Sequence, residues 1–305
     1  MVQLKVVFLG TSSSVPTKKR GLSSIAIKRG AEILLFDAGE CVQRAMINAG
    51  LGLNRPMKIF ITHLHGDHCV GLLGLLQSMS MMRRDKPLTI YGPKGLQSFI
   101  KSNIKALGFE LTFNLQINTV KQKLVVEEQE YTIYACKAEH PPLTYAYLLE
   151  EKPRPGVFYP EAAKSLGIPE GRLWHLLQKG EAITLQGRTI TPDQVTGPKR
   201  RGRKIGYSGD TRPSKKLIKF FKGCDLLIFD STYADRHADK AEENQHSTAR
   251  EAATIAKEAG VKTLVLTHFS ARYDDTAELV KEASEVHSNV VAAEDLMELD
   301  VKYPE

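Results

Sequence analysis

A dense group of potential metal ligands lies between residues 62 and 68, where the sequence reads THLHGDH. Within six residues it offers three imidazoles and one carboxylate, from His63, His65, Asp67 and His68. Imidazole nitrogens together with carboxylate oxygens are typical ligands of zinc and, less often, of manganese or iron. A loop that needs only to be soluble has no use for this density of ligands, so we predict a metal site and not a histidine-rich surface turn.

The flanking residues place these ligands at the end of a strand. The apolar run at 57–61 predicts a buried strand, and 70–82 predicts a helix. The loop between them therefore lies at the carboxyl end of the strand, which is where open α/β sheets carry their chemistry.

The spacing of the four ligands indicates more than one metal ion. In an extended segment alternate side chains share a side, so His63, His65 and Asp67 can converge, while Gly66 allows the tight turn that brings His68 back. Four ligands this close in the chain cannot easily surround one small ion. We therefore expect the two ligands at 63 and 65 to serve one ion and those at 67 and 68 a second.

Three further predicted strands end beside ligand-type residues. These strands, at 130–136, 204–208 and 262–267, lead to His140, Asp210 and His268. Each residue alone would more often be an ordinary turn residue than a ligand. Together they supply the ligands that a two-metal site still needs, with Asp210 able to bridge both ions.

The amino-acid composition limits the classes of protein to which the chain can belong. A chain of 305 residues that is 42% hydrophobic and 25% charged is typical of a folded α/β protein with a sizeable core. The four cysteines are scattered without C-x-x-C pairing, which predicts reduced thiols. The N-terminus has no signal-peptide pattern, and no stretch is long and apolar enough to span a membrane. We expect a cytoplasmic protein with no membrane partner.

The positive charge is concentrated in one segment. Residues 152–204 contain eleven basic and four acidic residues, which accounts for the whole net charge of +7. A localised basic surplus indicates a polyanionic partner. The segment 152–203 also holds six prolines among glycines and aromatics, so we interpret it as an insertion, either a flexible loop or an arm that carries Lys and Arg to phosphates.

The motif T-x-H-x-H-x-D-H resembles the signature of the metallo-β-lactamase superfamily, and the remaining motifs resemble its tRNA 3′-processing branch, the ribonuclease Z family. The residues 16–20, PTKKR, are similar to the family's P-x-K-x-R-N loop, with Gly21 where the family usually has Asn. His246, Ser247 and Thr248 resemble its His-Ser-Thr motif, which carries a catalytic histidine. The stretch 293–297 resembles its A-x-D-x motif.

The resemblance implies a fold and a ligand set. The fold would be an αββα sandwich of two mixed sheets, a single domain over residues 1–305, with a glycine- and proline-rich basic arm inserted at 152–203. One zinc ion would be held by His63, His65 and His140, a second by Asp67, His68 and His268, and both by Asp210. We expect two zinc ions per chain, with manganese as the alternative metal.

The resemblance also implies an activity. The enzyme would cut precursor tRNA after the discriminator nucleotide, leaving a tRNA 3′ hydroxyl and a trailer with a 5′ phosphate. His246 would be the general acid, and Asp67 would help to deprotonate or orient the nucleophile. A homodimer is implied, in which the arm of one subunit serves the site of the other. The candidate RNA-binding residues are Lys18, Arg20, Lys152, Arg154, Lys199, Arg200 and Arg201.

Two other classes of function share part of this pattern. A small-molecule hydrolase of the same fold would keep the metal motif but has no use for the basic insertion. A non-catalytic RNA-binding module would keep the basic insertion but need not keep seven ligands. Among the remaining polar residues, we predict that Asp37 supports a ligand histidine or satisfies backbone amides, and that His175, His237 and His287 lie on the surface.

Overall fold

The computed structural model describes residues 2–121 and 123–304, which form two units. The first unit contains residues up to 128, 132–150 and 203–302, and the second contains 129–131, 151–202 and the residues from 303 onward. None of the helices in the described part of the chain is long and apolar enough to cross a membrane. The four cysteines, Cys41, Cys69, Cys136 and Cys224, are all free thiols, as predicted.

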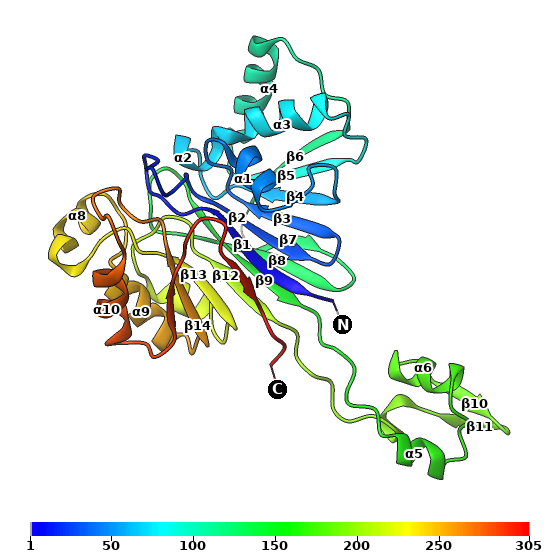
Figure 1. The fold of residues 1–305 in the computed structure, drawn as a ribbon. Helices are drawn as coiled ribbons and strands as arrows, with labels where there is room; N and C mark the ends of the chain where they lie inside the picture. The colour runs from blue at the N-terminus through cyan, green and yellow to red at the C-terminus, as the bar shows by residue number, and fades with distance from the viewer. Residues whose placement is uncertain (1, 122, 305) are drawn as a thin grey trace. The chain divides into compact units, whose positions relative to one another are not determined.

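The first unit is an αββα sandwich of two seven-stranded mixed sheets, which confirms the predicted fold (Figure 1). The first sheet has the order β16-β1-β2-β3-β4-β5-β6. Its strands are β1 (Leu4–Gly10), β2 (Ser24–Arg29), β3 (Glu32–Phe36), β4 (Met57–Phe60), β5 (Leu88–Gly92), β6 (Leu115–Thr119) and β16 (Glu298–Asp300).

The second sheet has the order β15-β14-β13-β12-β9-β8-β7. Its strands are β7 (Lys123–Glu127), β8 (Tyr131–Lys137), β9 (Tyr145–Glu151), β12 (Lys204–Tyr207), β13 (Leu226–Asp230), β14 (Thr263–Thr267) and β15 (Val290–Ala292). Aromatic rings fill part of the space between the sheets, because Phe36 and Phe60 of the first sheet pack on Tyr147 of the second, with ring centroids 5.8 and 5.6 Å away.

Helices cover the outer faces of both sheets (Figure 1). The apolar faces of α1, α3 and α4 pack with the first sheet, and those of α7, α9 and α10 pack with the second. The helices of this unit are α1 (Val42–Asn48), α2 (Gly66–Cys69), α3 (Gly71–Met81), α4 (Leu96–Leu107), α7 (Lys215–Phe220), the 3-10 turn η2 (Asp235–His237), α8 (Ala238–Glu243), α9 (Ala249–Glu258) and α10 (Ala277–Ser284).

Strand register decides where the site forms. In the first sheet β3, β4 and β5 are parallel, and Phe36, Phe60 and Tyr91 are aligned. In the second sheet β12, β13 and β14 are parallel, and Asp230 is aligned with Thr267. Parallel strands bring their carboxyl ends to one edge, so the loops that follow β4, β12, β13 and β14 meet there.

The second unit is a small folded module. It contains α5 (Pro160–Ser165), α6 (Arg172–Gln178), the hairpin of β10 (Ile183–Leu185) and β11 (Arg188–Ile190), and the 3-10 turn η1 (Pro192–Gln194). It has an apolar core of its own, formed by Ala163, Ile168, Leu177, Ile183, Ile190 and Val195. The segment that leads into the module pairs with the one that leads out, since Arg154 and Arg200 exchange backbone hydrogen bonds of 2.7 and 2.9 Å. Its interior is therefore structured and is not a flexible loop.

Candidate metal centre

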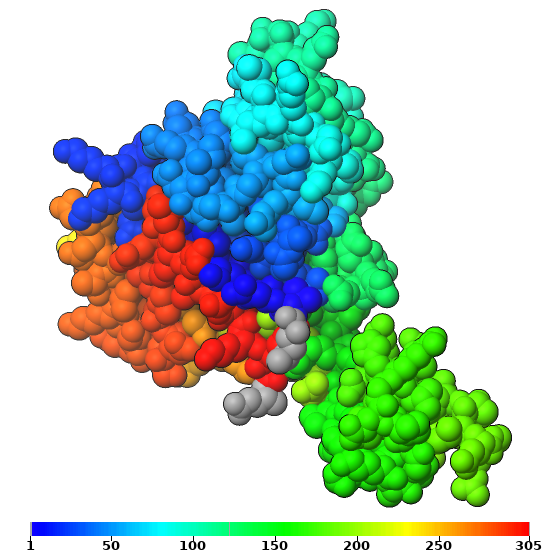
Figure 2. Space-filling model, turned by 45° about the vertical axis from the view of Figure 1, so that its right-hand side comes forward, coloured from blue at the N-terminus to red at the C-terminus, as the bar shows by residue number. Residues whose placement is uncertain are grey.

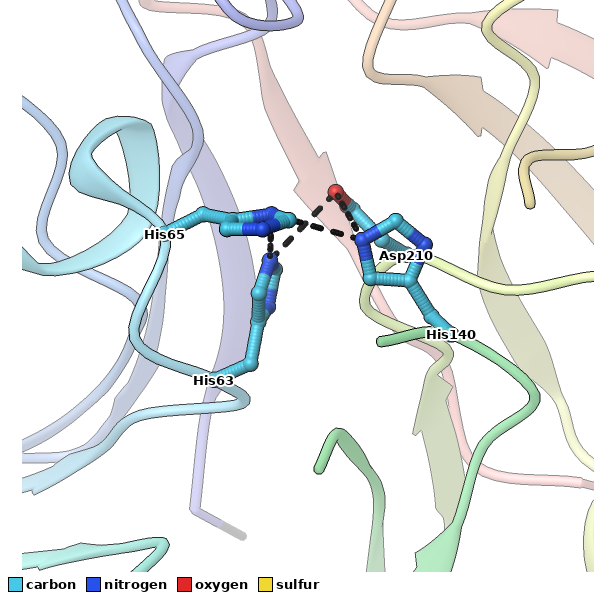
Figure 3. Close-up of side chains that lie close together, drawn as sticks. All are labelled: His63, His65, His140 and Asp210. Carbon is cyan, nitrogen blue, oxygen red and sulfur yellow. Dashed lines mark hydrogen bonds and ion pairs between the residues drawn. The ribbon is translucent and has the colours of Figure 1, made fainter. Parts of the chain in front are cut away.

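The seven predicted ligands lie together at the carboxyl edge of the two sheets. His63, His65, Asp67 and His68 follow β4, and the last two of them lie in the short helix α2. The others follow strands of the second sheet: His140 follows β8, Asp210 follows β12 and His268 follows β14. Figure 3 shows His63, His65 and His140 directed toward the carboxylate of Asp210.

Four ligand atoms form a first group. The Nδ1 atom of His65 lies 3.0 Å from Nε2 of His63 and 3.3 Å from Nε2 of His140. The Oδ2 atom of Asp210 lies 3.6 Å from Nε2 of His63 and 3.9 Å from Nε2 of His140. These four atoms are all within 4.8 Å of one another, so the group could hold a metal ion.

A second group shares Asp210 with the first. The Nε2 atoms of His68 and His268 lie 3.3 Å apart, and each is 3.5 Å from Oδ2 of Asp67. The other carboxylate oxygen of Asp210, Oδ1, is 3.2 Å from Nε2 of His68 and 3.3 Å from that of His268. One oxygen of Asp210 thus belongs to each group, which is the arrangement that a bridging carboxylate requires.

Buried hydrogen bonds aim two of the rings from the first sheet. Asp37 accepts a 2.7 Å hydrogen bond from Nδ1 of His68. Thr62 donates its hydroxyl hydrogen to Asp37 and therefore accepts from Nδ1 of His63, 2.9 Å away. With Nδ1 engaged as a donor, the lone pair of Nε2 faces the ligand group. Asp37 also accepts a hydrogen bond of 2.8 Å from Tyr207, so its predicted supporting role is confirmed.

Hydrogen bonds at Nδ1 also orient two histidine rings from the second sheet. Nδ1 of His140 donates to the carbonyl oxygen of Gln245 at 2.9 Å. Nδ1 of His268 is 2.9 Å from the hydroxyl of Thr232, which in turn donates to Asp230 at 2.6 Å. Four of the five histidines in the two groups therefore present Nε2, and His65 alone presents Nδ1.

Burial and charge prepare these side chains as ligands. Burial lowers the pKa of His63, of His65 and of His140, which favours the neutral imidazole that binds metal. Burial alone would raise the pKa of Asp210, but the neighbouring imidazoles, with His268 first, outweigh it and hold that pKa well below its usual value. Burial would also lower the pKa of His68, but the charges of Asp210 and Asp37 outweigh it and raise that pKa well above its usual value.

Two residues of this centre have a backbone φ in the left-handed region. Asp37 has φ of 57° and His268 has φ of 62°. Such a conformation costs on the order of 1–3 kcal/mol for a residue other than glycine and persists only where the surroundings enforce it. The peptide amide of Asp37 donates to the carbonyl oxygen of Phe60 at 2.9 Å, and that of Phe269 donates to Thr11 at 2.9 Å. These hydrogen bonds fix both turns.

His246 lies beside the two groups but is held by a different partner. Its Nδ1 donates to Oδ2 of Asp230 at 2.9 Å, and its side chain is only 10% exposed. Burial would lower the pKa of His246, but the charge of Asp230 and this hydrogen bond outweigh burial and raise the pKa to about 9. The ring therefore carries a proton at neutral pH, as a general acid must.

Asp230 is the functional residue that the sequence did not reveal. It is fully buried and accepts hydrogen bonds from His246, Thr232 and the amide of Thr211. Asp230 and His246 also lie within 4.8 Å of ligand atoms of Asp210 and His268. Hydrogen bonds account for this proximity, since Nδ1 of His246 faces Asp230 and Nδ1 of His268 faces Thr232. The place of Asp230 at the end of β13, on the same edge as the ligands, was the signal available in the sequence.

A cavity of about 410 Å³ opens onto these residues. The ligands on its wall are His65, Asp67, His140 and Asp210, and His246 lies beside them. The rest of the wall is formed by Ser14, Pro141, Tyr233, Glu243, Asn244 and Gln245. The amide of Ser14 donates to Oδ2 of Asp67 at 2.8 Å, which links the loop after β1 to the metal ligands.

The loop that holds Lys18 and Arg20 is fastened at its base. Nη1 of Arg20 donates to the hydroxyl of Thr11 and to the carbonyl oxygen of Ala293, both at 2.8 Å, and the guanidinium lies 4.7 Å from the centroid of the Phe269 ring. These contacts make Arg20 an anchor of the loop, and its contact with RNA stays a prediction. Lys18 is exposed.

The A-x-D-x stretch completes this anchor. Asp295 accepts from the amide of Gly21 at 2.6 Å and from the hydroxyl of Thr11 at 2.7 Å. Figure 2 shows the surface of the N-terminal segment, in dark blue, beside that of the C-terminal segments, in orange and red.

The remaining histidines divide into two cases. His175 is exposed and His237 is partly exposed. The prediction for His287 is wrong, because this residue is 8% exposed and Nε2 donates to the carbonyl oxygen of Val261 at 3.0 Å. It fastens the end of α10 to the segment before β14.

The chain is similar to known proteins over nearly its whole length. It is 54% identical to ribonuclease Z of Nitrosopumilus maritimus, covering 98% of this chain and 100% of the relative. It is 45% identical to ribonuclease Z of Methanosarcina acetivorans, covering 98% and 99%. The crystal structure of human tRNase Z, short form, matches with a TM-score of 0.73 at 29% identity, covering 98% of this chain and 99% of that one.

Two family models match separate parts of the chain. The one described as Anti-Pycsar protein Apyc1 matches residues 4–152, and the one described as Beta-lactamase superfamily domain matches residues 194–269. The two mixed sheets and the His/Asp clusters at their edge define a metal-dependent hydrolase of the metallo-β-lactamase fold. Given its full-length identity to curated members, the chain belongs to the ribonuclease Z family.

Proposed function

We propose that this chain is a zinc-dependent endoribonuclease that removes the 3′ trailer of precursor tRNA, cutting after the discriminator nucleotide. The observation that carries the proposal is the position of Asp210, whose two oxygens each face one complete group of ligands, next to the pair of His246 and Asp230. Phosphodiester hydrolysis needs both charge stabilisation and a proton donor, and these residues could supply both.

The donor set fits two zinc ions. Ligands about 2.0–2.1 Å from a tetrahedral zinc are about 3.3 Å apart. The ligand-to-ligand distances given above run from 3.0 to 3.9 Å, and all atoms of the first group lie within 4.8 Å of one another. His63, His65 and His140 would hold one ion, Asp67, His68 and His268 the other, and Asp210 both. Two such ions, when bound, make water a nucleophile near neutral pH and neutralise charge on the phosphate.

The side chains of this centre divide the remaining work. Asp67 presents Oδ2 to the ligand group from the wall of the cavity, and so could orient or deprotonate the attacking water. His246 would donate its proton to the departing 3′ oxygen, which would otherwise leave as an unstable alkoxide. Asp230 keeps the ring of His246 protonated and fixed in direction.

RNA binding is proposed for two exposed basic regions. One is the loop with Lys18 and Arg20. The other is the arm at 152–203, an insertion in an otherwise single metallo-β-lactamase domain, whose candidate contacts are Lys152, Arg154, Lys199, Arg200 and Arg201. Lys199, Arg200 and Arg201 are exposed, and they lie in the segment that leads out of the module. We further propose a homodimer in which the arm of each subunit serves the site of its partner.

The test of the function is cleavage of a defined substrate. The purified protein, loaded with zinc, is incubated with a precursor tRNA that carries a 3′ trailer, and the ends are mapped. We expect one cut after the discriminator nucleotide, a 3′ hydroxyl on the tRNA and a 5′ phosphate on the trailer. Chelation should abolish the cut, and added zinc should restore it. Hydrolysis of a small phosphodiester without any cut in precursor tRNA would overturn the proposal.

The first prediction concerns the arm. Replacing residues 153–202 with a short Gly-Ser linker should leave metal content and hydrolysis of a small phosphodiester near normal, because the arm's apolar core is its own. Cleavage of precursor tRNA should collapse, since the segment 152–204 carries the net positive charge. For every phosphate that the arm no longer neutralises, the slope of log affinity against log salt should fall by about 0.7–0.9.

The matched control for this truncation keeps the fold and removes charge alone. Changing Lys199, Arg200 and Arg201 together to glutamine should reproduce part of the loss in affinity and in salt slope without altering metal content. Unchanged precursor tRNA affinity in both variants would show that RNA is held elsewhere.

A further inference from the structure

An arginine stands over the wall of the catalytic cavity. The guanidinium of Arg272 lies 4.9 Å from the centroid of the Tyr233 ring, and its Nε donates to the hydroxyl of Ser270 at 3.0 Å. Tyr233 lines the cavity, and its ring centroid is 6.2 Å from that of His246. Arg272 itself is exposed. A cation is therefore held over a tyrosine whose ring lies next to the proposed general acid.

The surface beneath Arg272 is rigid. Tyr233 is 7% exposed, its hydroxyl accepts a hydrogen bond from Asn244 at 3.2 Å, and its carbonyl accepts one from the amide of Ala249 at 3.0 Å. The amide of Ser270 donates to the carbonyl oxygen of Thr232 at 3.2 Å. Both supports of Arg272, the tyrosine ring and the serine hydroxyl, are thus fixed to the strand ends that orient His268 and His246.

The charge of Arg272 is not neutralised by a salt bridge among the described residues, in contrast to its neighbours. Arg236 also lies over a tyrosine, with its guanidinium 5.9 Å from the ring of Tyr273, but it forms an ion pair with Glu278 at 3.0 Å. Arg212 forms a two-pronged pair with Glu251. With Nε on Ser270, the two terminal amino groups of Arg272 remain to bind an anion.

We propose that Arg272 contacts the RNA backbone at the phosphate that precedes the discriminator nucleotide. This inference rests on the proposed function. His246 would protonate the 3′ oxygen of the discriminator nucleotide, so the acceptor strand lies on the His246 side of the scissile phosphate. Arg272 stacks on Tyr233, whose ring neighbours that of His246. A guanidinium stacked on an aromatic ring keeps its planar fork in place, and that fork matches two oxygens of one phosphate.

The test compares Arg272→Ala with a matched control, Arg236→Ala, which removes an exposed arginine over a tyrosine that already has a carboxylate partner. Affinity for 3′-extended precursor tRNA is measured over a range of salt on zinc-loaded protein. Arg272→Ala should weaken binding about tenfold, as expected for one charge-assisted contact, and lower the salt slope by about 0.7. Arg236→Ala should change neither. Hydrolysis of a small phosphodiester should stay normal in both.

A chemically altered substrate locates the contact. The modified precursor carries a neutral methylphosphonate in place of the phosphate before the discriminator nucleotide. Wild-type protein should bind it about tenfold less well than it binds the unmodified RNA. Arg272→Ala should bind the two RNAs equally well. Fully additive losses would place the contact elsewhere and overturn the assignment. The assignment also fails if the two arginine variants weaken binding equally, or if Arg272→Ala slows the small phosphodiester.

The outcome separates this contact from the function on which it rests. Wild-type protein that hydrolyses the small phosphodiester but leaves precursor tRNA uncut would overturn the proposed function. Normal wild-type cleavage together with unchanged affinity and salt slope in Arg272→Ala would overturn only the contact.

Discussion

Replacing Asp210 with alanine is expected to lower the bound metal below two ions per chain and to abolish phosphodiester cleavage. Its Oδ1 lies 3.2 Å from Nε2 of His68, and its Oδ2 lies 3.6 Å from Nε2 of His63, so its loss removes a ligand from both groups. Removing a group that only supports a ligand costs up to about 100-fold, and a shared ligand should cost more. Metal content by atomic absorption and turnover of a small phosphodiester measure the two effects.

The control for Asp210 is an aspartate outside the centre. Asp239 is exposed at the start of α8, so Asp239→Ala should keep both metal content and turnover. Full metal content with near-normal turnover in Asp210→Ala would contradict the bridging assignment.

Replacing His246 with alanine is expected to keep the metal and the fold while lowering kcat by roughly 10²-fold or more. Its Nδ1 bonds Asp230 and not a ligand group, so metal content should not depend on it. The defect should shrink for a substrate whose leaving group needs no proton, such as a nitrophenyl ester. Metal that is lost in step with activity would make His246 a ligand and refute the acid role.

A second variant tests how Asp230 acts on this acid. The carboxylate raises the pKa of His246 to about 9, which keeps the acid protonated at neutral and mildly alkaline pH. Asp230→Asn removes that charge, so the pKa of His246 should fall. The alkaline limb of the pH profile of kcat should then move to lower pH, which a purely structural role of Asp230 would not cause.

Local patterns predicted which strands end beside ligand-type residues, and the family resemblance implied the fold. The apolar runs that became β4, β12 and β14 each end beside a ligand, and parallel strands bring such ends to one edge. A capping box between Thr248 and Glu251 starts α9, and such a cap depends only on residues three apart. These features are encoded within short stretches, which is why the sequence predicted them.

The features that the sequence missed depend on distant partners. Asp230 and His246 are separated by 16 positions and meet only when β13 and α9 pack. The anchoring contacts of Arg20 were also not predicted, because its partners Thr11, Ala293 and Phe269 lie outside the basic loop. The small apolar core of the arm was not predicted. Its six buried residues have no helical or strand periodicity over a segment that is rich in proline and glycine.

The anchor formed by Arg20 and Asp295 has a consequence for how the protein is made. The loop after β1 reaches its final position only when residues 293–295 are present, and β1 pairs with β16, the last strand. Chains are synthesised from the N-terminus, so the ligands at 63–68 are translated before His268 and before the residues that anchor the loop. No shorter nascent chain carries a complete catalytic edge. The catalytic edge therefore becomes complete only after residue 295 has been translated.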